Sequence, residues 1–434
     1  MFATARSAMK LFFGVGLLWL LAPRAVAAEN WPQWRGPEGD GVAADGEYPV
    51  KFSGEEGVAW KVELPGRGSS TPAVWGDSIF VTCGMDGQDG IVSYDMEGNE
   101  RWRRQLGAER AGKHRNGSGS NPSPVTDGKH VVVYFKSGTV ACLDFDSHEL
   151  WRINLQEKFG KDTLWWDIGT SPVLARDRAI IAVMQAGESY LVALNLADGT
   201  VLWKQPRQYE CTVESDHAYT TPELVRVSGQ DLVVSWGADH LTAHDSATGE
   251  VVWECGGFNP RDQGNWRAIA STATRDGIAV VPFGRGDFVA GVRLDGRGDV
   301  TQSHRAWLRE GVGSDVPTPA IDGRRVYLLG DKRQLTCLDL QTGKDIWTAE
   351  LPKNLNKFYA SPVLGGDKLY CTREDGVVFV GNVDAERFEQ LAENDMGERV
   401  IATPIPIRGG LLIRGEQHLF WIGAPAATKA ATGG

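Results

Sequence analysis

Several motifs of common catalytic sites are missing from this sequence. It has no G-x-S-x-G turn to carry a nucleophilic serine and no glycine-rich loop ending in Gly-Lys-Ser or Gly-Lys-Thr, which excludes those serine-hydrolase and P-loop sites. Its eight histidines are scattered, with none at metal-ligand spacing, and its six cysteines form no C-x-x-C pair. We therefore expect no metal site of a familiar sequence type.

Basic clusters and helical patterns are also missing. The formal net charge is −11, and a nucleic-acid surface needs clustered lysine and arginine, so no nucleic-acid partner is expected. No long stretch shows the 3.6-residue periodicity of an amphipathic helix. By contrast, 53 glycines and 16 tryptophans are many for 434 residues. They indicate numerous turns and a recurring packing role for tryptophan.

The N-terminus has the pattern of a secretory signal peptide. Arg6 and Lys10 precede a short apolar run, residues 11–22, and small residues follow at 25–28. The run is short for a membrane span, although an uncleaved anchor is the alternative. The sequence predicts a signal peptide over 1–28 and a mature protein that is acidic, periplasmic or secreted, monomeric and without a transmembrane segment.

One short sequence motif recurs along the chain. Residues 193–203 read ALNLADGTVLW, residues 243–253 read AHDSATGEVVW and residues 337–347 read CLDLQTGKDIW. The final tryptophan recurs 40 to 54 residues apart, with a phenylalanine in the eighth place. This first marker comprises Trp60, Trp102, Trp151, Trp203, Trp253, Trp307, Trp347 and Phe388.

A second sequence marker recurs in register with the first. A hydroxyl residue stands before proline in seven units, and Ser271-Thr272 fills the remaining place. The seven are Thr71-Pro72, Ser123-Pro124, Ser171-Pro172, Thr221-Pro222, Thr318-Pro319, Ser361-Pro362 and Thr403-Pro404. Within a unit, four short apolar runs are separated by turns with Asp-Gly or Thr-Gly, as in residues 318–349. Repeated four-stranded units predict an all-β propeller, with the marker tryptophans packed between blades.

The marker places predict eight blades. The last unit has no fourth strand, and the first tryptophan precedes any inner strand, so residues 59–64 are expected to complete the last blade and close the ring. The predicted organisation is an arm over 29–58, the propeller over 59–424 and a loose tail over 425–434.

The cysteines fit this pattern. Cys142 and Cys337 take the place that alanine has in other units, which indicates small buried strand residues. Cys211 and Cys255 follow successive tryptophans and could pair in an oxidising compartment, which their spacing leaves open.

The unit AHDSATGEVVW, with Asp245, Thr248, Gly249 and Trp253, resembles the quinoprotein-type repeat. That repeat builds the eight-bladed propellers of pyrroloquinoline quinone (PQQ) dehydrogenases and of BamB, a periplasmic scaffold in outer-membrane protein assembly. The resemblance covers residues 30–423 and implies the fold more strongly than the function. Residues 31–41, WPQWRGPEGDG, are similar to an N-terminal motif of exported bacterial members, and we interpret Trp31 and Trp34 as a clasp for the arm.

Residues just before each inner strand should line one mouth of the central channel. This set comprises Arg67, Asn116, Trp166, Asp167, His217, Trp266, Arg267, Asp315, Lys357 and Arg399. Such a mouth could simply be wet surface, as in any propeller, or it could bind a polar ligand. In the second case Asp167 and Asp315 are the acid or base candidates, and Arg267, Lys357 and Arg399 could hold an anion.

The leading hypothesis is a BamB-like scaffold that binds a cell-envelope protein without catalysis or cofactor. A PQQ dehydrogenase with Ca²⁺ is the alternative, but the adjacent cysteine pair of its alcohol-oxidising members is absent. A carbohydrate or cell-wall polymer binder is the third reading, because Trp165, Trp166 and Trp266 could stack sugar rings or anchor a partner.

Overall fold

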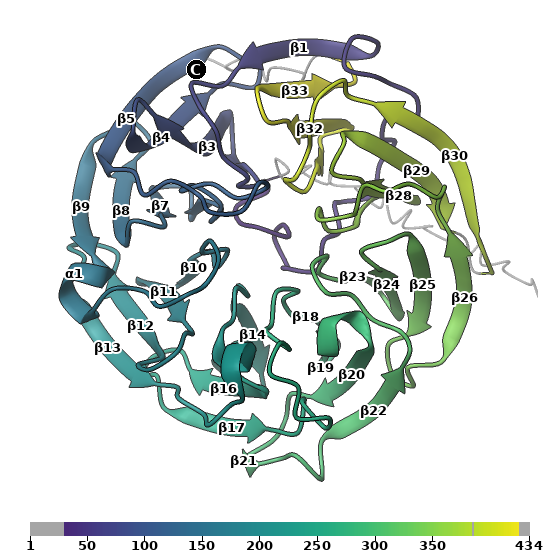
Figure 1. Ribbon diagram of the computed structural model, residues 1–434. Helices are drawn as coiled ribbons and strands as arrows, with labels where there is room; N and C mark the ends of the chain where they lie inside the picture. Colours follow the sequence, from purple (N-terminus) through teal and green to yellow (C-terminus); the bar gives the residue numbers. More distant parts are fainter. Residues whose placement is uncertain (1–29, 384–385, 425–434) are drawn as a thin grey trace, which may run out of the picture.

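The chain folds into a ring of eight antiparallel sheets around a central axis (Figure 1). The computed structural model describes residues 30–383 and 386–424, so the predicted signal peptide and tail lie outside the described residues. Within the described ranges, no helix is long and apolar enough to cross a membrane. The eight-bladed, all-β propeller predicted from the repeat is therefore confirmed.

Each blade runs from an inner to an outer strand. Blade 1 comprises β2 (Ala73–Trp75), β3 (Ser78–Met85), β4 (Gln88–Tyr94) and β5 (Glu100–Ala108). Blade 2 comprises β6 (Val125–Thr126), β7 (His130–Tyr134), β8 (Thr139–Asp144) and β9 (Glu149–Asn154), followed by helix α1 (Leu155–Phe159). Blade 3 comprises β10 (Val173–Ala175), β11 (Arg178–Val183), β12 (Tyr190–Asn195) and β13 (Val201–Pro206), followed by a 3-10 turn (Val213–Asp216). Blade 4 comprises β14 (Glu223–Val227), β15 (Gln230–Gly237), β16 (His240–Asp245) and β17 (Val251–Cys255).

The second half of the ring repeats this order. Blade 5 comprises β18 (Ala273–Arg275), β19 (Ile278–Phe283), β20 (Phe288–Arg293) and β22 (Arg305–Glu310), with a 3-10 turn (Gly284–Gly286) between β19 and β20. Blade 6 comprises β23 (Ala320–Asp322), β24 (Arg325–Leu329), β25 (Gln334–Asp339) and β26 (Asp345–Glu350). Blade 7 comprises β27 (Val363–Gly365), β28 (Lys368–Thr372), β29 (Val377–Val383) and β30 (Phe388–Asp395). Blade 8 comprises β31 (Ile405–Ile407), β32 (Gly410–Arg414), β33 (His418–Ile422) and β1 (Val58–Glu63).

The ring is closed by the start of the chain, as predicted. Strand β1 pairs antiparallel with β33, and Trp60 lies opposite Trp421 with ring centroids 6.4 Å apart. Because this pairing covers the edge of β33 and the chain then continues into blade 1, the start of the chain locks the last blade to the first.

The marker tryptophans lie between blades and tie each blade to the next. The indole N–H of Trp151 donates to the carbonyl of Leu196 (2.7 Å), and that of Trp307 donates to Leu340 (2.8 Å). The turn glycine of the next blade packs on the same ring, since a Cβ on Gly199 would lie 2.7 Å from Trp151. The glycine therefore leaves room for the preceding blade's tryptophan, in addition to adopting the positive φ of the turn.

The second marker forms a ring of hydrogen bonds around the axis. The backbone N–H of Thr71 donates to Ser123 Oγ, and the N–H of Ser123 donates to Ser171 Oγ. Seven such links of 2.8 to 3.1 Å join neighbouring inner strands from Thr71 to Thr403. A hydroxyl residue suits this place because its side chain accepts from the backbone N–H of the preceding blade at the crowded centre of the ring.

The N-terminal arm crosses one end of the channel (Figure 1). Trp31 is buried and exchanges two backbone hydrogen bonds of 2.8 Å with Val74 of blade 1, which supports the interpretation of this residue as a clasp. Arg35, which is 2 % exposed, donates from its two Nη atoms to the carbonyls of Pro319 and Pro362, both at 2.8 Å. The arm thereby joins blade 1 to blades 6 and 7 across the axis.

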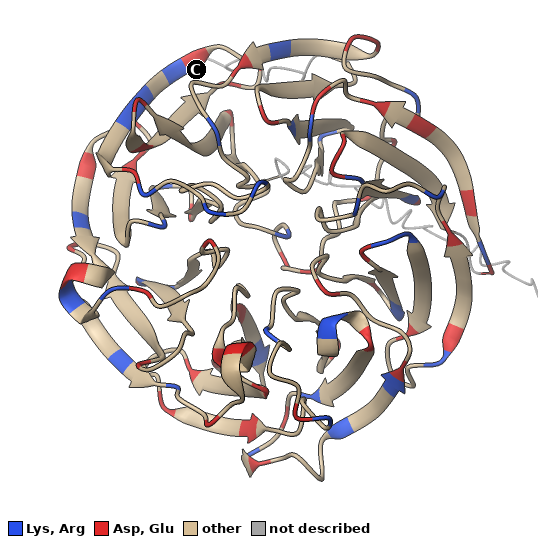
Figure 2. Ribbon diagram, in the orientation of Figure 1, with Lys and Arg blue, Asp and Glu red and all other residues tan. Residues whose placement is uncertain are grey.

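Three further features of the fold are an additional strand, the state of the cysteines and the distribution of charge. A short strand, β21 (Gly298–Asp299), pairs parallel with β17 and lies outside the predicted four-strand unit. Cys142 and Cys337 are buried in strands as predicted, whereas Cys211 and Cys255 have free thiols and form no disulfide with each other. Basic and acidic residues are both spread around the outer strands (Figure 2).

Candidate functional site

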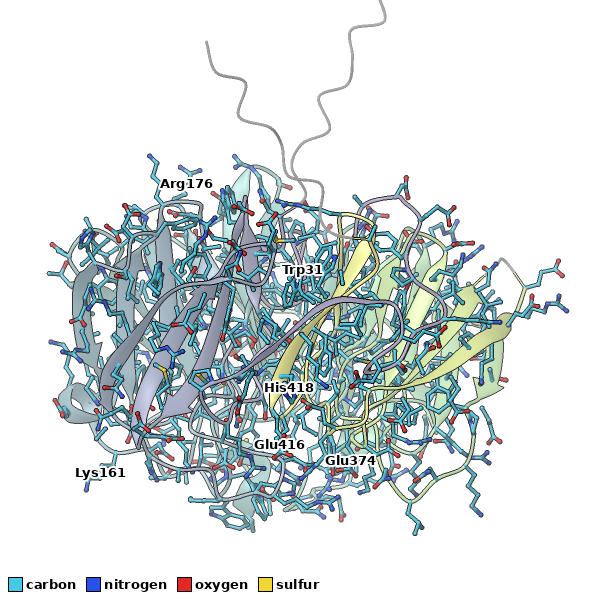
Figure 3. The ribbon with its side chains drawn as sticks, turned by 90° about the horizontal axis from the view of Figure 1, so that it is seen from above. Trp31, Lys161, Arg176, Glu374, Glu416 and His418 are labelled. Carbon is cyan, nitrogen blue, oxygen red and sulfur yellow. The ribbon has the colours of Figure 1, made fainter. Side chains whose placement is uncertain are left out.

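A cavity of about 440 Å³, lined by both polar and apolar groups, lies on the axis. Its wall includes the hydroxyl ring, and Trp34 of the arm also lines it. Trp31 lies toward the arm end of the molecule, whereas Glu374 and Glu416 lie toward the other end, as seen from the side (Figure 3). We call the end with Glu374 the mouth face and the end crossed by the arm the floor.

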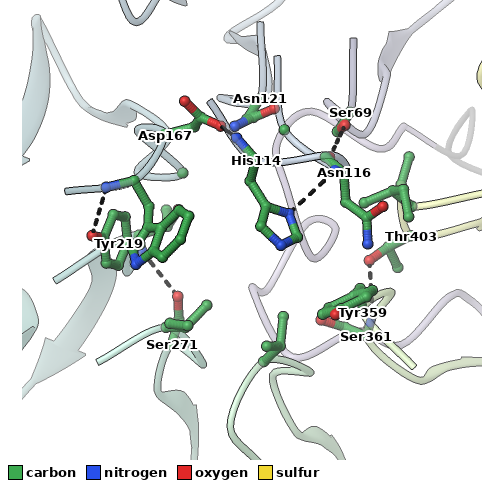
Figure 4. A pocket seen from close by; sticks show the side chains of 18 of the residues that line it. Ser69, His114, Asn116, Asn121, Asp167, Tyr219, Ser271, Tyr359, Ser361 and Thr403 are labelled. Atoms are coloured by element: carbon green, nitrogen blue, oxygen red, sulfur yellow. Dashed lines mark hydrogen bonds between the residues drawn. The ribbon is translucent and has the colours of Figure 1, made fainter. Parts of the chain in front are cut away.

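Six of the ten residues predicted for the mouth line this cavity. They are Asn116, Trp166, Asp167, Arg267, Asp315 and Lys357. Figure 4 shows Asn116 and Asp167 on neighbouring parts of the wall, with His114 between them. The loops before the inner strands therefore converge on one cavity, because each inner strand begins next to the axis.

The other four predicted residues lie elsewhere. Arg67 and Arg399 line a small separate recess, where Arg67 Nε lies 3.2 Å from Glu416 Oε1. His217 is 1 % exposed, and the ring of Trp165 packs edge-on against it. Trp266 is 8 % exposed because it packs on Phe288, so it offers no open face to a sugar ring.

Asp167 is fully engaged in holding the mouth loops together. Its carboxylate forms an ion pair with Lys136 and accepts backbone N–H groups from Lys113 and His114 at 2.8 and 2.9 Å. The Lys136 side chain is 1 % exposed and also donates to the carbonyl of Ala111. A carboxylate with these three donors anchors the mouth loops, whatever further role its remaining acceptor site has.

The loop between β5 and β6 crosses the mouth face to blade 7. Arg115 Nη2 contacts both oxygens of Glu374 at 3.0 Å, and Asn116 Nδ2 donates to Glu374 Oε2 at 2.8 Å. The Glu374 side chain is 3 % exposed and also accepts the backbone N–H of Lys357. This carboxylate therefore pins the loop between blades 1 and 2 to blade 7.

Sequence reasoning missed the residues that enter the cavity from the turns between second and third strands. Arg285 has a positive φ of 59°, and its Nε lies 3.1 Å from Asp315 Oδ2. Asp331 accepts the backbone N–H groups of Asp315 and Val316. Burial and the nearby carboxylate of Asp315 raise the pKa of Asp331 to about 6. The repeat itself offered a signal, since these turns recur at a fixed place in every unit.

His114 and two tyrosines were also missed. The Nδ1 atom of His114 accepts the backbone N–H of Asn116 at 3.1 Å, while burial and the charge of Arg115 lower the pKa of the ring. In this neutral form the proton is on Nε2, which can donate into the cavity. Tyr219 and Tyr359 complete the aromatic part of the wall (Figure 4).

Two exposed tryptophans stand beside the cavity on a fixed backbone. Trp165 and Trp166 are 52 % and 42 % exposed, and Val213 nearby is 63 % exposed. The backbone N–H of Trp166 donates to Tyr219 Oη, and its indole N–H donates to Glu214 Oε1 at 3.2 Å. We call Trp165, Trp166 and Val213 the aromatic patch, which is an apolar surface on rigid support.

Comparisons with known proteins agree with this architecture. Outer membrane protein assembly factor BamB of Salmonella typhimurium is 25 % identical over 317 residues, covering 70 % of this chain and 74 % of that protein. The crystal structure of BamB from Moraxella catarrhalis has a TM-score of 0.62 at 15 % identity, covering 84 % of this chain and 99 % of that one. A europium-containing methanol dehydrogenase has a TM-score of 0.68 at 11 % identity, covering 89 % of each chain, so that this likeness shows the fold alone.

A family model carries the assignment further than the single relatives do. The model described as outer membrane protein assembly factor BamB matches residues 50–253, 187–303 and 289–391, which together span most of the propeller. The chain therefore belongs to the BamB family of quinoprotein-like propellers.

Proposed function

We propose that this chain is an exported, non-catalytic scaffold of the cell envelope that binds a protein of outer-membrane assembly. Membership of the BamB family supports the cellular process, and the single observation that carries partner binding is the aromatic patch. Exposed tryptophan is a common anchor of protein interfaces, because it adds a large contact area with little loss of conformational freedom.

The patch is pre-organised for this role. Lys113 Nζ donates to the carbonyls of Leu164 and Trp165, and the adjacent Asp167 is fixed by Lys136. Val213 is held at a positive φ of 49°, which is uncommon for a β-branched residue and persists only where the surrounding structure imposes it. A rigid anchor reduces the entropy cost of association, so a partner can bind tightly through a small contact.

Site-specific cross-linking tests this proposal. A photoreactive residue at position 165 is expected to cross-link to one envelope protein in intact cells, whereas the same residue at position 176, on the floor end, is not (Figure 3). With the captured protein purified, the double variant Trp165→Ala/Val213→Ser is expected to weaken binding by about tenfold or more. Equal capture from both positions, or undiminished binding by the double variant, would argue against the patch as the docking surface.

The side chains around the cavity fit a PQQ cofactor poorly. His114 and Trp166 meet edge-on at an interplanar angle of 85°, whereas a flat quinone favours a slot between parallel rings. In the described part of the chain, no group of three His, Cys, Asp or Glu residues is arranged to hold a metal ion. Adding PQQ with Ca²⁺ to the purified protein is therefore expected to leave the melting temperature unchanged and to give no dye-linked alcohol oxidation.

A further inference from the structure

A wide groove adjoins the cavity from the side. It has a volume of about 1160 Å³ and lies between blades 5 and 6 on the mouth face. Its walls come from the β19–β20 turn and the β22–β23 linker of blade 5, and from the β24–β25 turn of blade 6. Four residues line both spaces, namely Arg285, Asp315, Asp331 and Lys357. We call this space the side groove.

The groove leads to a closed end. Trp34 lines the far part of the cavity, and the arm behind it is fixed through the Arg35 hydrogen bonds to Pro319 and Pro362. An elongated molecule that lies in the groove therefore has its end beside the cavity, at the four residues that line both spaces, and the arm blocks the far side of the ring. The shape favours a ligand with an extended body and a small polar terminus.

The groove wall exposes an unpaired stretch of main chain. In the part of the chain that the structure describes, the N–H groups of Val312, Gly313 and Ser314 donate no hydrogen bond to another residue. Ser314 is 2 % exposed, and buried main-chain N–H groups are nearly always paired in folded proteins. Because successive N–H groups of an extended chain point to opposite sides, a peptide in the groove would supply carbonyl acceptors for alternate ones, as in β-strand addition.

The closed end carries groups suited to a carboxylate and its neighbouring amide. Arg267 lines the cavity and forms an ion pair with Glu214, with Nε 3.4 Å from Glu214 Oε1, and this buried Nε has no hydrogen bond among the described residues. His114 Nε2 is a second donor. Asn116 is 7 % exposed, and its Oδ1, which is buried, has no donor within the described ranges.

We propose that the side groove and the central cavity together bind the carboxyl-terminal end of an extended polypeptide. Its main chain pairs with Val312–Ser314, its terminal carboxylate meets Arg267 and His114, and basic side chains near its end meet Asp315 and Asp331. A peptide fits better than an oligosaccharide, because the groove's aromatic residue, Trp266, is buried under Phe288 and offers no stacking face. The inference adds a second binding surface to the proposed scaffold, and this surface shares only Trp166 with the aromatic patch.

A pair of peptide pools tests this site. Fluorescein-labelled octapeptides of random sequence are prepared with a free carboxyl terminus and, separately, with a carboxyl-terminal amide, and their binding to the full protein is followed by anisotropy. The free-acid pool is expected to bind about tenfold more tightly than the amide pool, as a charge-assisted contact should give. Arg267→Met is expected to remove this preference, and Arg176→Met, on the floor end, is the matched control.

Each remaining outcome decides the proposal. Equal binding of the two pools, no binding of either, or displacement of the bound pool by chitotetraose would overturn it. If Arg267→Met lowers the melting temperature, Lys357→Met is the second test, because it changes an exposed side chain where the groove meets the cavity. It is expected to weaken binding of the free-acid pool several-fold. The variant Trp165→Ala/Val213→Ser should keep the carboxylate preference, so failure of the docking proposal and failure of this one are distinguishable.

Discussion

The two ends of the channel belong to the same ring of blades but are stabilised differently. At the floor, one arginine from the arm, Arg35, donates to backbone carbonyls of blades 6 and 7. At the mouth, the carboxylates of Asp167 and Glu374 hold loops of different blades through side-chain and backbone donors. The arm at the floor is thus held by residues that belong to the repeated unit. The mouth is held by loops whose sequence the repeat does not specify.

This difference explains which end of the channel can accommodate variation in sequence. The partners of Arg35 are the carbonyls of Pro319 and Pro362, which belong to the second sequence marker. The partners of Glu374 are Arg115 and Asn116, which belong to a loop of one unit only. Loops that no other unit depends on are free to carry a binding surface, and the aromatic patch and side groove both lie at that end.

The largest effect is expected from breaking the buried ion pair at the mouth. Lys136→Met leaves the Asp167 carboxylate without its counter-ion inside the fold, which should lower the free energy of unfolding by about 3–5 kcal/mol in urea denaturation. Lys161→Met, at an exposed lysine on the same face, should change it by less than about 0.5 kcal/mol.

A double variant checks the cause of that loss. Lys136→Met/Asp167→Leu removes both charges, so it should be more stable than Lys136→Met alone. If the double variant is instead the less stable of the two, the loops are held by packing around Lys136 and not by its charge.

The second effect concerns the floor. Arg35→Met removes two charged hydrogen bonds and leaves two buried carbonyls unpaired, which should cost about 2–3 kcal/mol in the same assay. Hydrogen exchange should rise in residues 31–43 and stay unchanged in the loop 109–121, whereas Arg176→Met should alter neither. Equal loosening of both ends would mean that they are coupled through the ring and are not separately fastened.

The sequence predicted what is repeated. The marker tryptophan recurs in seven of the eight units and the hydroxyl residue in all of them, so a single chain reports the packing between blades and the hydrogen-bonded ring around the axis. The same logic located Asp315 and Lys357 at the cavity, because each stands just before an inner strand.

What occurs once could not be predicted in this way. Trp266 also precedes an inner strand, yet it turns into its own blade because Phe288 offers an apolar surface there. Arg67 is drawn toward Glu416 in a separate recess. Arg285 reaches the cavity only because its backbone has a positive φ, and the contact between Arg115 and Glu374 joins residues 259 positions apart. No local pattern encodes such pairings.

The pH dependence of stability should also distinguish the two ends. Burial raises the pKa of Glu223, near Arg35 and Asp40, from 4.5 to about 8. Between these values the folded protein holds a proton that the unfolded chain has lost, so the free energy of unfolding should fall as the pH rises from about 5 to 8.

Two variants separate the contributions of Glu223 and Asp331 to the pH dependence of stability. Glu223→Gln is expected to flatten the profile over that whole window. Asp331→Asn, at the mouth, should flatten it only between about pH 4 and 6, because the pKa of Asp331 is raised from 3.8 to about 6. Urea denaturation at each pH provides the measurement, and unchanged profiles for both variants would mean that other groups control the slope.

The smallest effect is expected where the mouth loop meets blade 7. The Arg115 side chain is 65 % exposed, so Arg115→Met should lower the free energy of unfolding by no more than about 1 kcal/mol. Glu374 keeps the Asn116 side chain and the Lys357 backbone N–H as donors, which is why its carboxylate stays satisfied. Glu374→Leu removes that shared acceptor, and hydrogen exchange in the loop 109–121 should then rise well above its level in Arg115→Met. If both variants release the loop equally, the exposed ion pair alone fastens the mouth, and the buried amide contact contributes nothing to it.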